Sequence, residues 1–403
     1  MQDARPIGSA SLLAARQDRL RLLARRIRVA LGQEPADLVL EGGNVVNVFT
    51  LQVEPASVAI ADGWIAAVGP HEWPARERIA LEGRFILPGL IDSHMHLEST
   101  LLAPSELARL IVPHGTTATI SDSHEVGNVL GTKGIDILIA ASADLPMDLF
   151  FTASSCVPAT RFEDNGAVLG PAEVRSLLER PRVLGLAEMM DMPAVLRADA
   201  DVLEKIAAAQ ELGRALDGHA AGLEGLDLLA YAATGIRSDH ESTAAAEALA
   251  RARLGMLVQV REGSSARNLD AILPLLASGA LGDDWCLVTD DIFPDDLHAR
   301  CHLDGLLRRL VAGGVPAATA VRHASLVPAR HYGLKDSGAV APGYHADLVV
   351  VQDLAAFQPG LVLKNGLVAA RDGICVAPTS APRLPRDNTV HIAPIDESAF
   401  RLK

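Results

Sequence analysis

Two histidines separated by one residue, His94 and His96, have the residue type and spacing of a metal-binding pair. Alternate side chains of an extended chain point to the same side, so both imidazoles can reach one metal ion. An H-x-H pair by itself is weak evidence. Its position is more informative, because it follows Pro88–Asp92, a segment with the composition of a buried strand.

Further titratable side chains stand at the ends of other predicted strands. They are Asp122, His124, Glu125, Glu188, His219, Asp239, His240, Glu241, Asp290 and Asp291. In a (β/α)8 barrel the carboxyl ends of the strands converge on one face, where active sites form. Charges that only solvate a surface would not be confined to strand ends. The pattern therefore predicts one site that is rich in imidazoles and carboxylates.

The segment from about 85 to 340 alternates strand patterns with helix patterns. Eight strands are predicted at 84–94, 116–122, 148–154, 183–189, 216–220, 235–240, 255–262 and 285–291. Helices are predicted between them, for example at 172–180, 200–213, 243–255 and 266–278. This number and length match a (β/α)8 barrel. The alternative, a doubly wound open sheet, would want a glycine-rich phosphate turn, and neither G-x-G-x-x-G nor a P-loop occurs.

Both ends of the chain carry short β-patterns. At each end, apolar runs alternate with glycine-containing turns, at 36–50 and 56–69 and again at 345–353 and 361–373. The sequence Ala-Asp-Leu-Val occurs in both parts, at 36–39 and at 346–349. Asn365-Gly366 is a strong hairpin signal, because Asn-Gly suits a turn with positive φ. The simplest interpretation is that the two ends form one small β-domain and that the middle of the chain is inserted between them.

Composition and charge narrow the classes of partner. The net charge of −14 repels phosphate backbones, so nucleic acid is not an expected partner. Four widely spaced cysteines without C-x-x-C predict reduced thiols in a cytoplasmic protein. No apolar run is long enough to span a membrane. Residues 11–31 predict a basic helix docked on the domain or on a partner subunit, with a membrane-surface role as the less favoured alternative.

Several long motifs resemble the adenine deaminase family of the amidohydrolase superfamily, and the resemblance covers about 36–395. The longest motif is PGLIDSHMHLESTLLAPSELARLIVPHGTTATISDSHEVGNVLG, at 88–131. Shorter ones are SSCVPAT (154–160), GLAEMMD (185–191), DGHAAGL (217–223), DHES (239–242), REGSSARNL (261–269) and TDD (289–291). The resemblance implies a (β/α)8 barrel with a small β-sandwich domain formed by both chain ends.

The predicted organisation has four parts. They are an N-terminal helical segment (1–35), the β-sandwich domain (36–85 with 341–380), the metal-dependent barrel (86–340), and a C-terminal tail or beginning of a further C-terminal domain (381–403). Typical relatives continue beyond this point into such a domain. A second departure is Ser123, which stands where the family often has proline.

The resemblance also implies a centre of two divalent transition metals. His94 and His96 would bind the first metal, His219 and His240 would bind the second, and Glu188 would bridge both. Asp290 would be a further ligand of the first metal. Four imidazoles and two carboxylates suit manganese, iron or zinc, and the ligand types do not discriminate between these metals.

The implied reaction is hydrolytic deamination of adenine to hypoxanthine and ammonia by a metal-activated hydroxide. Asp290 would relay a proton to the leaving group, and Glu241 would act beside ring N1. His124, Glu125 and Asp291 are expected to contact the purine, with structural roles as the alternative.

Other functions and partners stay open at this point. The near alternative is a deaminase of a modified purine or nucleoside, such as N6-methyladenine, and the farther one is another cyclic-amide amidohydrolase. A binding protein without catalysis is disfavoured, because all six ligand positions are filled. The expected partners are a small-molecule purine and further copies of the chain, in a dimer or larger homo-oligomer, without nucleic acid or membrane.

Overall fold

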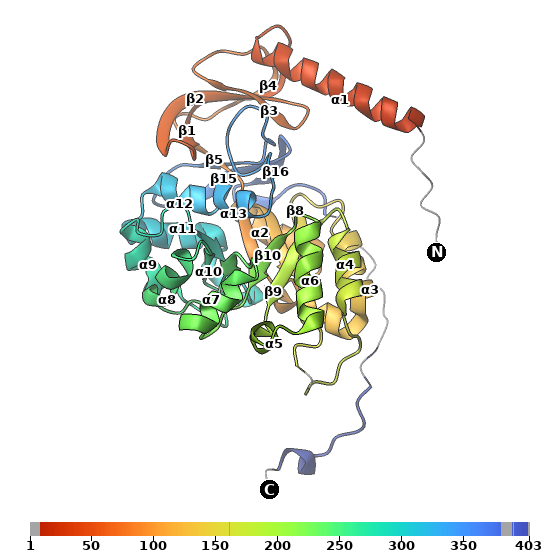
Figure 1. The fold of residues 1–403 in the computed structure, drawn as a ribbon. Coiled ribbons are helices and arrows are strands. Elements are labelled where there is room, and N and C mark those ends of the chain that lie inside the picture. The colour runs from red at the N-terminus through yellow and green to blue at the C-terminus, as the bar shows by residue number, and fades with distance from the viewer. Residues whose placement is uncertain (1–8, 161, 380–388, 390, 402–403) are drawn as a thin grey trace.

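The computed structural model describes residues 9–160, 162–379, 389 and 391–401 of the 403-residue chain. Figure 1 shows a β-rich part, built from the red and blue ends of the chain, beside a part in which helices surround parallel strands. The predicted C-terminal tail is described only in part, with a short 3₁₀ helix at Glu397–Phe400.

Eight parallel strands form the barrel in the described part of the chain. They are β6 (Leu90–Met95), β7 (Thr116–Asp122), β8 (Asp148–Ala153), β9 (Val183–Met189), β10 (Ala215–Gly218), β11 (Ser238–Asp239), β12 (Leu257–Arg261) and β13 (Trp285–Val288). Strands β6 to β10 form one sheet and β11 to β13 a second. The sheets adjoin where Arg237 N–H donates to the Leu216 carbonyl, and where Met95 bridges to Asp290.

The prediction of an α/β barrel is confirmed, and two strands are shorter than expected. The predicted strand 235–240 is reduced to β11, because Gly235 has a φ of 95° and belongs to the preceding turn. The predicted strand 285–291 ends at Val288, because Asp290 has a φ of 58° and leaves the extended region.

Helices cover the outside of the barrel (Figure 1). They are α2 (Pro104–Ile111), α3 (His124–Ala141), α4 (Pro171–Leu178), α5 (Met192–Leu196), α6 (Ala200–Glu211), α7 (Gly225–Ala233), α8 (Ala245–Ala252), α9 (Leu269–Ala277), α10 (Pro294–Arg300), α11 (Leu303–Ala312), α12 (Ala317–His323) and α13 (Leu326–His331). Two 3₁₀ turns lie at Glu98–Thr100 and Val112–His114. Proline opens α2, α4 and α10, where its missing N–H needs no partner.

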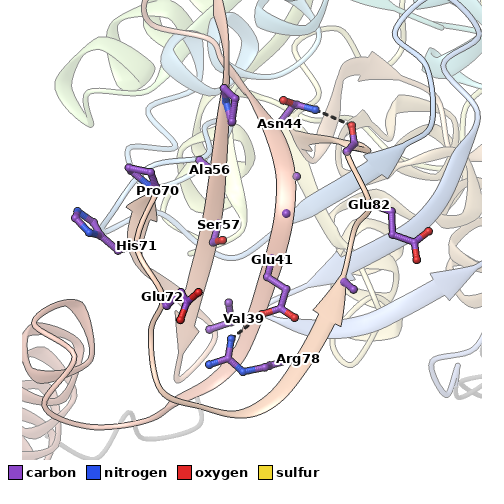
Figure 2. A pocket seen from close by; sticks show the side chains of 15 residues that line it. Val39, Glu41, Asn44, Ala56, Ser57, Pro70, His71, Glu72, Arg78 and Glu82 are labelled. Carbon is purple, nitrogen blue, oxygen red and sulfur yellow. Dashed lines mark hydrogen bonds and ion pairs between the residues drawn. The ribbon is translucent and has the colours of Figure 1, made fainter.

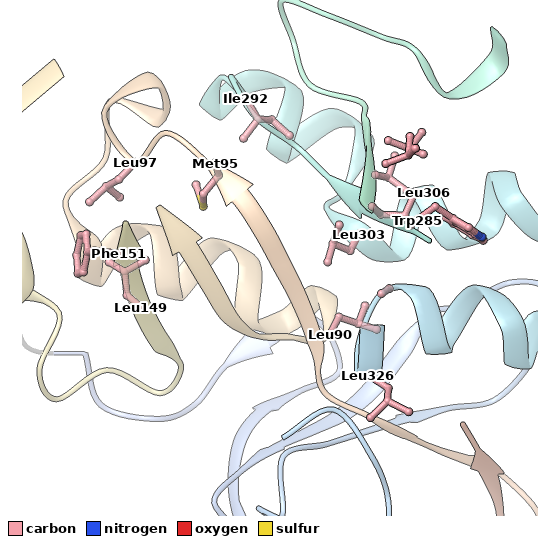
Figure 3. Packing of buried hydrophobic residues seen from close by; sticks show 14 of the residues in the cluster. Leu90, Met95, Leu97, Leu149, Phe151, Trp285, Ile292, Leu303, Leu306 and Leu326 are labelled. Carbon is pink, nitrogen blue, oxygen red and sulfur yellow. The ribbon is translucent and has the colours of Figure 1, made fainter. Parts of the chain in front are cut away.

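The apolar core of the barrel joins its strands to its helices. Figure 3 shows side chains of β6, β8 and β13 in one cluster with side chains of α11 and α13. Its labelled members include Leu90, Met95, Phe151, Leu303 and Leu326, all of which are buried. Burial on this scale anchors the strands, so the polar residues at their ends are held in fixed positions.

The two ends of the chain meet in one nine-stranded sheet. Its strands are β1 (Ala36–Asn47), β2 (Gln52–Ala61), β3 (Trp64–Gly69), β4 (Ala75–Ala80), β5 (Phe85–Pro88), β14 (Leu348–Val351), β15 (Pro359–Lys364), β16 (Leu367–Arg371) and β17 (Ile374–Cys375). Strand β5 pairs with both β1 and β14 and so connects the two ends. The Asn365-Gly366 hairpin is confirmed, with φ of 49° and 75°. A two-layer sandwich stays a prediction.

Helix α1 (Ser9–Ala30) precedes this sheet, close to the predicted bounds of 11–31. Its last turns dock on the sheet, where the Trp73 indole N–H donates to the Ala30 carbonyl at 3.0 Å and Val29 is buried. None of the helices in the described ranges has the length and apolar character needed to cross a membrane. The four cysteines are free thiols.

A buried histidine makes the stability of this fold sensitive to acid. His323 stacks on Trp285 with ring centroids 3.9 Å apart, and its Nδ1–H donates to the Trp285 carbonyl at 2.6 Å. Burial lowers the pKa of His323 from 6.5 to about 4. Between about pH 4 and pH 6.5, the imidazole of His323 is therefore protonated more in the unfolded chain than in the folded one. Stability falls as the pH falls through this window, by up to about 3 kcal/mol.

We expect His323→Asn to reduce the acid sensitivity of the fold. The asparagine amide can still donate to the Trp285 carbonyl, but it does not titrate. The measurement is the difference between the urea midpoints at about pH 7.5 and about pH 5, which should be smaller in the variant. Lost ring packing lowers both midpoints alike and leaves the difference unaffected. An equal difference in both proteins would contradict the assignment.

Candidate metal centre

The predicted metal-binding pair lies at the carboxyl end of β6. His96 Nε2 lies 3.1 Å from Asp290 Oδ1, and His94 Nε2 lies 3.6 Å from the same oxygen. His96 Nδ1 lies 3.1 Å from the carbonyl oxygen of Asp122, which can only accept a hydrogen bond. The proton of His96 is therefore placed on Nδ1, and the Nε2 lone pair is left for a metal.

Glu188, the last but one residue of β9, lies between two pairs of imidazoles. Its Oε1 is 4.0 Å from His94 Nε2 and 3.4 Å from His96 Nε2. Its Oε2 is 2.6 Å from His219 Nδ1 and 3.2 Å from His240 Nε2. Each oxygen of one carboxylate thus faces a different histidine pair, which is the geometry that a bridging ligand requires.

Asp290 is positioned by its backbone. Its N–H donates to the His94 carbonyl at 3.0 Å, and the Asp290 carbonyl accepts from the His96 N–H at 3.3 Å. These bonds tie the end of β13 to the end of β6 and turn the carboxylate toward both imidazoles. The left-handed φ of 58° is tolerated better by Asp and Asn than by most residues.

The buried charges of the site are mutually dependent. Burial raises the pKa of Glu188, but His240, His219 and His94 outweigh it and hold that pKa well below the ordinary value. Burial lowers the pKa of His96, but Asp290, Glu125 and Glu188 hold it well above the ordinary value. Without a metal, the carboxylates therefore retain protons on imidazoles, and a divalent cation would replace these protons.

The residues present fit a divalent transition metal. His94 Nε2 is buried and makes no hydrogen bond to any of the described residues. Donor atoms of His94, His96 and Asp290 lie within 4.8 Å of one another, as do those of His94, Glu188 and His240. Borderline imidazole nitrogens combined with carboxylate oxygens are the ligand set of such metals. The structure thus brings all six predicted ligand residues into one cluster.

His124 and Glu125, predicted to contact the substrate, lie against this cluster at the start of α3. His124 Nδ1 is 3.1 Å from Asp122 Oδ2 and 3.8 Å from Glu188 Oε1. Burial lowers the pKa of His124, but Asp122 and Glu125 raise it by more, to about 10. Glu125 Oε1 is 3.6 Å from His96 Nδ1.

A small cavity opens on the cluster and is the space available to a substrate. Its volume is about 190 Å³. It is lined by His96, His124, Glu125, Glu188, Met190, His219, His240, Glu241, Arg261, Asp290 and Asp291. Asp291 accepts a hydrogen bond of 2.5 Å from the Ser99 hydroxyl, which turns its carboxylate toward the loop that follows β6.

Arg261, the last residue of β12, bridges two carboxylates inside the cavity. Its Nη1 contacts Glu241 Oε1 and lies 2.8 Å from Asp290 Oδ2, and its Nη2 lies 3.0 Å from Glu241 Oε2. Glu262 instead pairs with Arg309, away from the cluster.

Glu98 was not predicted as a site residue. Its Oε1 accepts from the Val126 N–H at 3.1 Å, and its buried Oε2 makes no hydrogen bond to the described residues. Burial raises the pKa of Glu98 to about 7, and the nearby Glu125 carboxylate adds to this. Its place two residues after His96, in the same motif, is the signal that could have identified it.

A second group of metal-binding residue types lies outside this cavity and carries no assignment. Donor atoms of His114, Cys301 and Asp304 lie within 4.8 Å of one another. However, Arg308 Nη1 donates to Asp304 Oδ2 at 3.0 Å. A cation there would meet a fixed positive charge, which disfavours its binding.

We expect Arg261→Met to lower kcat/KM by about 10- to 100-fold, the equivalent of a lost charge-assisted hydrogen bond. Glu241 and Asp290 would face each other without the intervening cation, while all six predicted metal ligands are retained. Arg267→Met is the matched control, because Arg267 lies on the loop that follows β12 and contacts Asp296 outside the cavity. Kinetics at verified metal content measure the effect, and equal values for the two variants would contradict it.

Comparisons with known proteins agree with this geometry. Residues 85–371 match the model of the amidohydrolase family. The chain is 45% identical to an adenine deaminase of Nitratidesulfovibrio vulgaris over 384 residues, which is 94% of this chain and 66% of that relative. It is 48% identical to an adenine deaminase of Deinococcus radiodurans over 335 residues, 83% of this chain and 62% of the relative. The chain thus spans less than two thirds of the length of these curated relatives.

The fold is also similar to solved structures of low sequence identity. One is a beta-aspartyl dipeptidase from Fervidobacterium islandicum AW-1, with a TM-score of 0.63 and 18% identity. The similarity covers 87% of this chain and all of that structure. At this level of identity, the comparison supports the fold alone.

Proposed function

Because the chain belongs to the amidohydrolase family, we propose that it hydrolyses adenine to hypoxanthine and ammonia at its metal centre. The observation that carries the metal chemistry is the position of Glu188, whose two oxygens face two separate histidine pairs. The adenine deaminases among the relatives support the choice of substrate.

The proposed ligand assignment follows the contacts. His94, His96 and Asp290 would hold one metal ion, His219 and His240 would hold the other, and Glu188 would bind both. When bound, such a pair of manganese, iron or zinc ions lowers the pKa of water at the site, so that water ionises near neutral pH. A metal-supported hydrolysis needs no other cofactor.

The remaining steps fall to side chains of the chain itself. Asp290 lies against the first histidine pair and would accept the proton of the attacking water, then deliver it to the amino nitrogen that leaves C6 as ammonia. The second proton of that water would pass to ring N1 by way of Glu241, which is proposed to lie beside N1. Arg261 would hold the Glu241 carboxylate in place through its contacts with both carboxylate oxygens. His124, Glu125 and Asp291 are proposed to contact the rest of the purine.

The test of the proposed function is ammonia release from a purine panel by metal-loaded protein. The panel contains adenine, N6-methyladenine (followed by methylamine release), adenosine and a cyclic amide. We expect release from adenine with the highest kcat/KM. No release from any purine would refute the proposal, and release only from the methylated base or the nucleoside would replace adenine as the substrate.

Several finer expectations accompany this proposal. They are the β-sandwich form of the sheet domain, the domain limits given above, the binuclear rather than mononuclear centre, the cytoplasmic location and the homo-oligomeric state. The measurement that bears most directly on the centre is the metal content per chain, for which we expect about two equivalents.

A further inference from the structure

Helix α1 carries apolar side chains on two opposite sides. The inner side docks on the sheet through Val29, and the Arg26 guanidinium lies 4.4 Å from the ring centroid of Trp64. The other side presents an apolar row to solvent, which we call the outer stripe. Its members and their exposed fractions are Leu20 (57%), Leu23 (43%) and Ile27 (61%) on α1, and Leu31 (65%) in the turn that follows the helix. Spacings of three, four and four residues align these side chains as in a helix-packing seam.

The helix cannot bury the outer stripe by rolling on its own chain. Arg25 fixes its rotation through ion pairs with Glu34 at 2.9 Å, Asp37 at 2.6 Å and Asp62 at 2.6 Å. Figure 1 shows α1 along the edge of the β-rich part, with its N-terminal end directed away from it. None of the residues that the structure describes covers the outer stripe, so this apolar surface is available to another molecule.

A large cavity lies on the same β-rich part and shares no lining residue with the cavity at the metal centre. Figure 2 shows it as an open groove over β1, β2 and β4, with a volume of about 800 Å³. We call it the acidic groove, because Glu41, Glu72 and Glu82 line it beside small apolar residues such as Ala56. The lining also includes Arg78, whose guanidinium donates a hydrogen bond to the Glu41 carboxylate at 2.7 Å.

Charge identifies which surface suits the outer stripe. Helix α1 carries the arginines Arg16, Arg19, Arg21, Arg25, Arg26 and Arg28, against the single acid Asp18. The whole chain has a net charge of −14, so the helix is a basic element on an acidic protein. Two α1 helices packed on each other would repel, whereas α1 and the acidic groove are complementary.

We propose that the outer stripe of α1 packs into the acidic groove of a second copy of this chain, and that the exchange is reciprocal. The two surfaces are neighbours, because Glu72 of the groove precedes Trp73, whose indole donates to Ala30 at the end of α1. Because the two surfaces are neighbours, a two-fold axis can place the stripe of each copy in the groove of the other. Both contacts then form within one pair of chains, and the assembly is a closed dimer. This proposal does not depend on the reaction catalysed.

The first test is sedimentation of the 403-residue chain over a range of concentrations. We expect a dimer whose dissociation constant rises by at least about 100-fold in Leu23→Glu/Ile27→Glu, because two negative charges replace apolar side chains opposite the glutamates of the acidic groove. The matched control is Leu226→Glu/Leu229→Glu on α7, an exposed leucine pair outside the outer stripe, which should leave the constant within about threefold. The milder Leu23→Ser/Ile27→Ser serves if circular dichroism shows that the glutamates prevent folding.

The second test identifies the partner surface by charge exchange. Glu72→Arg/Glu82→Arg should weaken the dimer, and adding Arg19→Glu/Arg21→Glu in the same chain should restore most of the affinity. Restoration is specific to a contact between these two surfaces, because each set alone places like charges together.

Three outcomes would overturn the proposal. The first is a chain that stays monomeric at about 100 µM, far above the dissociation constants of specific dimers. The second is a dimer that is insensitive to both the stripe and the groove variants. The third is a monomer that co-sediments through α1 with vesicles of phosphatidylserine and phosphatidylcholine, which would assign the outer stripe to an anionic membrane surface instead.

Discussion

Glu188→Gln is expected to remove at least half of the bound metal and to lower turnover by on the order of 10³. The carboxylate offers one oxygen to each histidine pair, at 3.4 Å from His96 Nε2 and 2.6 Å from His219 Nδ1. The amide of glutamine is neutral and has one oxygen. Its NH2 group would face one of the two pairs, so the ligand sets of both metal ions would be weakened.

Elemental analysis of the purified variant measures the metal loss, and ammonia release measures the turnover. Glu262→Gln is the matched control, because Glu262 is also buried at the end of a barrel strand but pairs with Arg309. We expect the control to keep its metal. Wild-type metal content in Glu188→Gln would refute the bridging role, whatever its activity.

Asp290→Asn is expected to lower kcat by about 10²- to 10⁴-fold, the range for loss of a proton-transfer group. Asparagine also tolerates the left-handed φ of 58°, so the backbone bonds between Asp290 and β6 should persist. The variant tests the chemistry of the carboxylate, because the fold at this position is preserved and only proton acceptance and part of the metal coordination are lost.

The neighbouring substitution Asp291→Asn provides the comparison for this variant. Asp291 lines the same cavity, but its carboxylate accepts from Ser99 and does not contact the histidines that face Asp290. We expect its effect to fall mainly on KM. Steady-state kinetics at equal metal content separate the two cases. Near-normal turnover of Asp290→Asn would remove this residue from the mechanism.

The sequence by itself determined the strands of the barrel and the residues at their ends. Apolar runs bounded by turns predict strands locally, and parallel strands of a barrel must present their carboxyl ends on one face. The hairpin at Asn365-Gly366 was predictable for the same reason, since the turn depends on two adjacent residues. His94 and His96 could likewise be paired from their spacing together with their place at the end of a predicted strand.

Contacts between distant segments were decided by the tertiary structure. The position of Arg261 between Glu241 and Asp290, and the burial of Glu98 beside Glu125, depend on how strands far apart in the sequence pack. The exposure of the outer stripe could not be predicted from the sequence either. The spacing of apolar residues predicts that α1 has a buried face, but it does not show which of its two apolar faces is covered. Periodicity reports the local conformation of a chain, whereas side-chain partners and solvent exposure are set by packing across the whole fold.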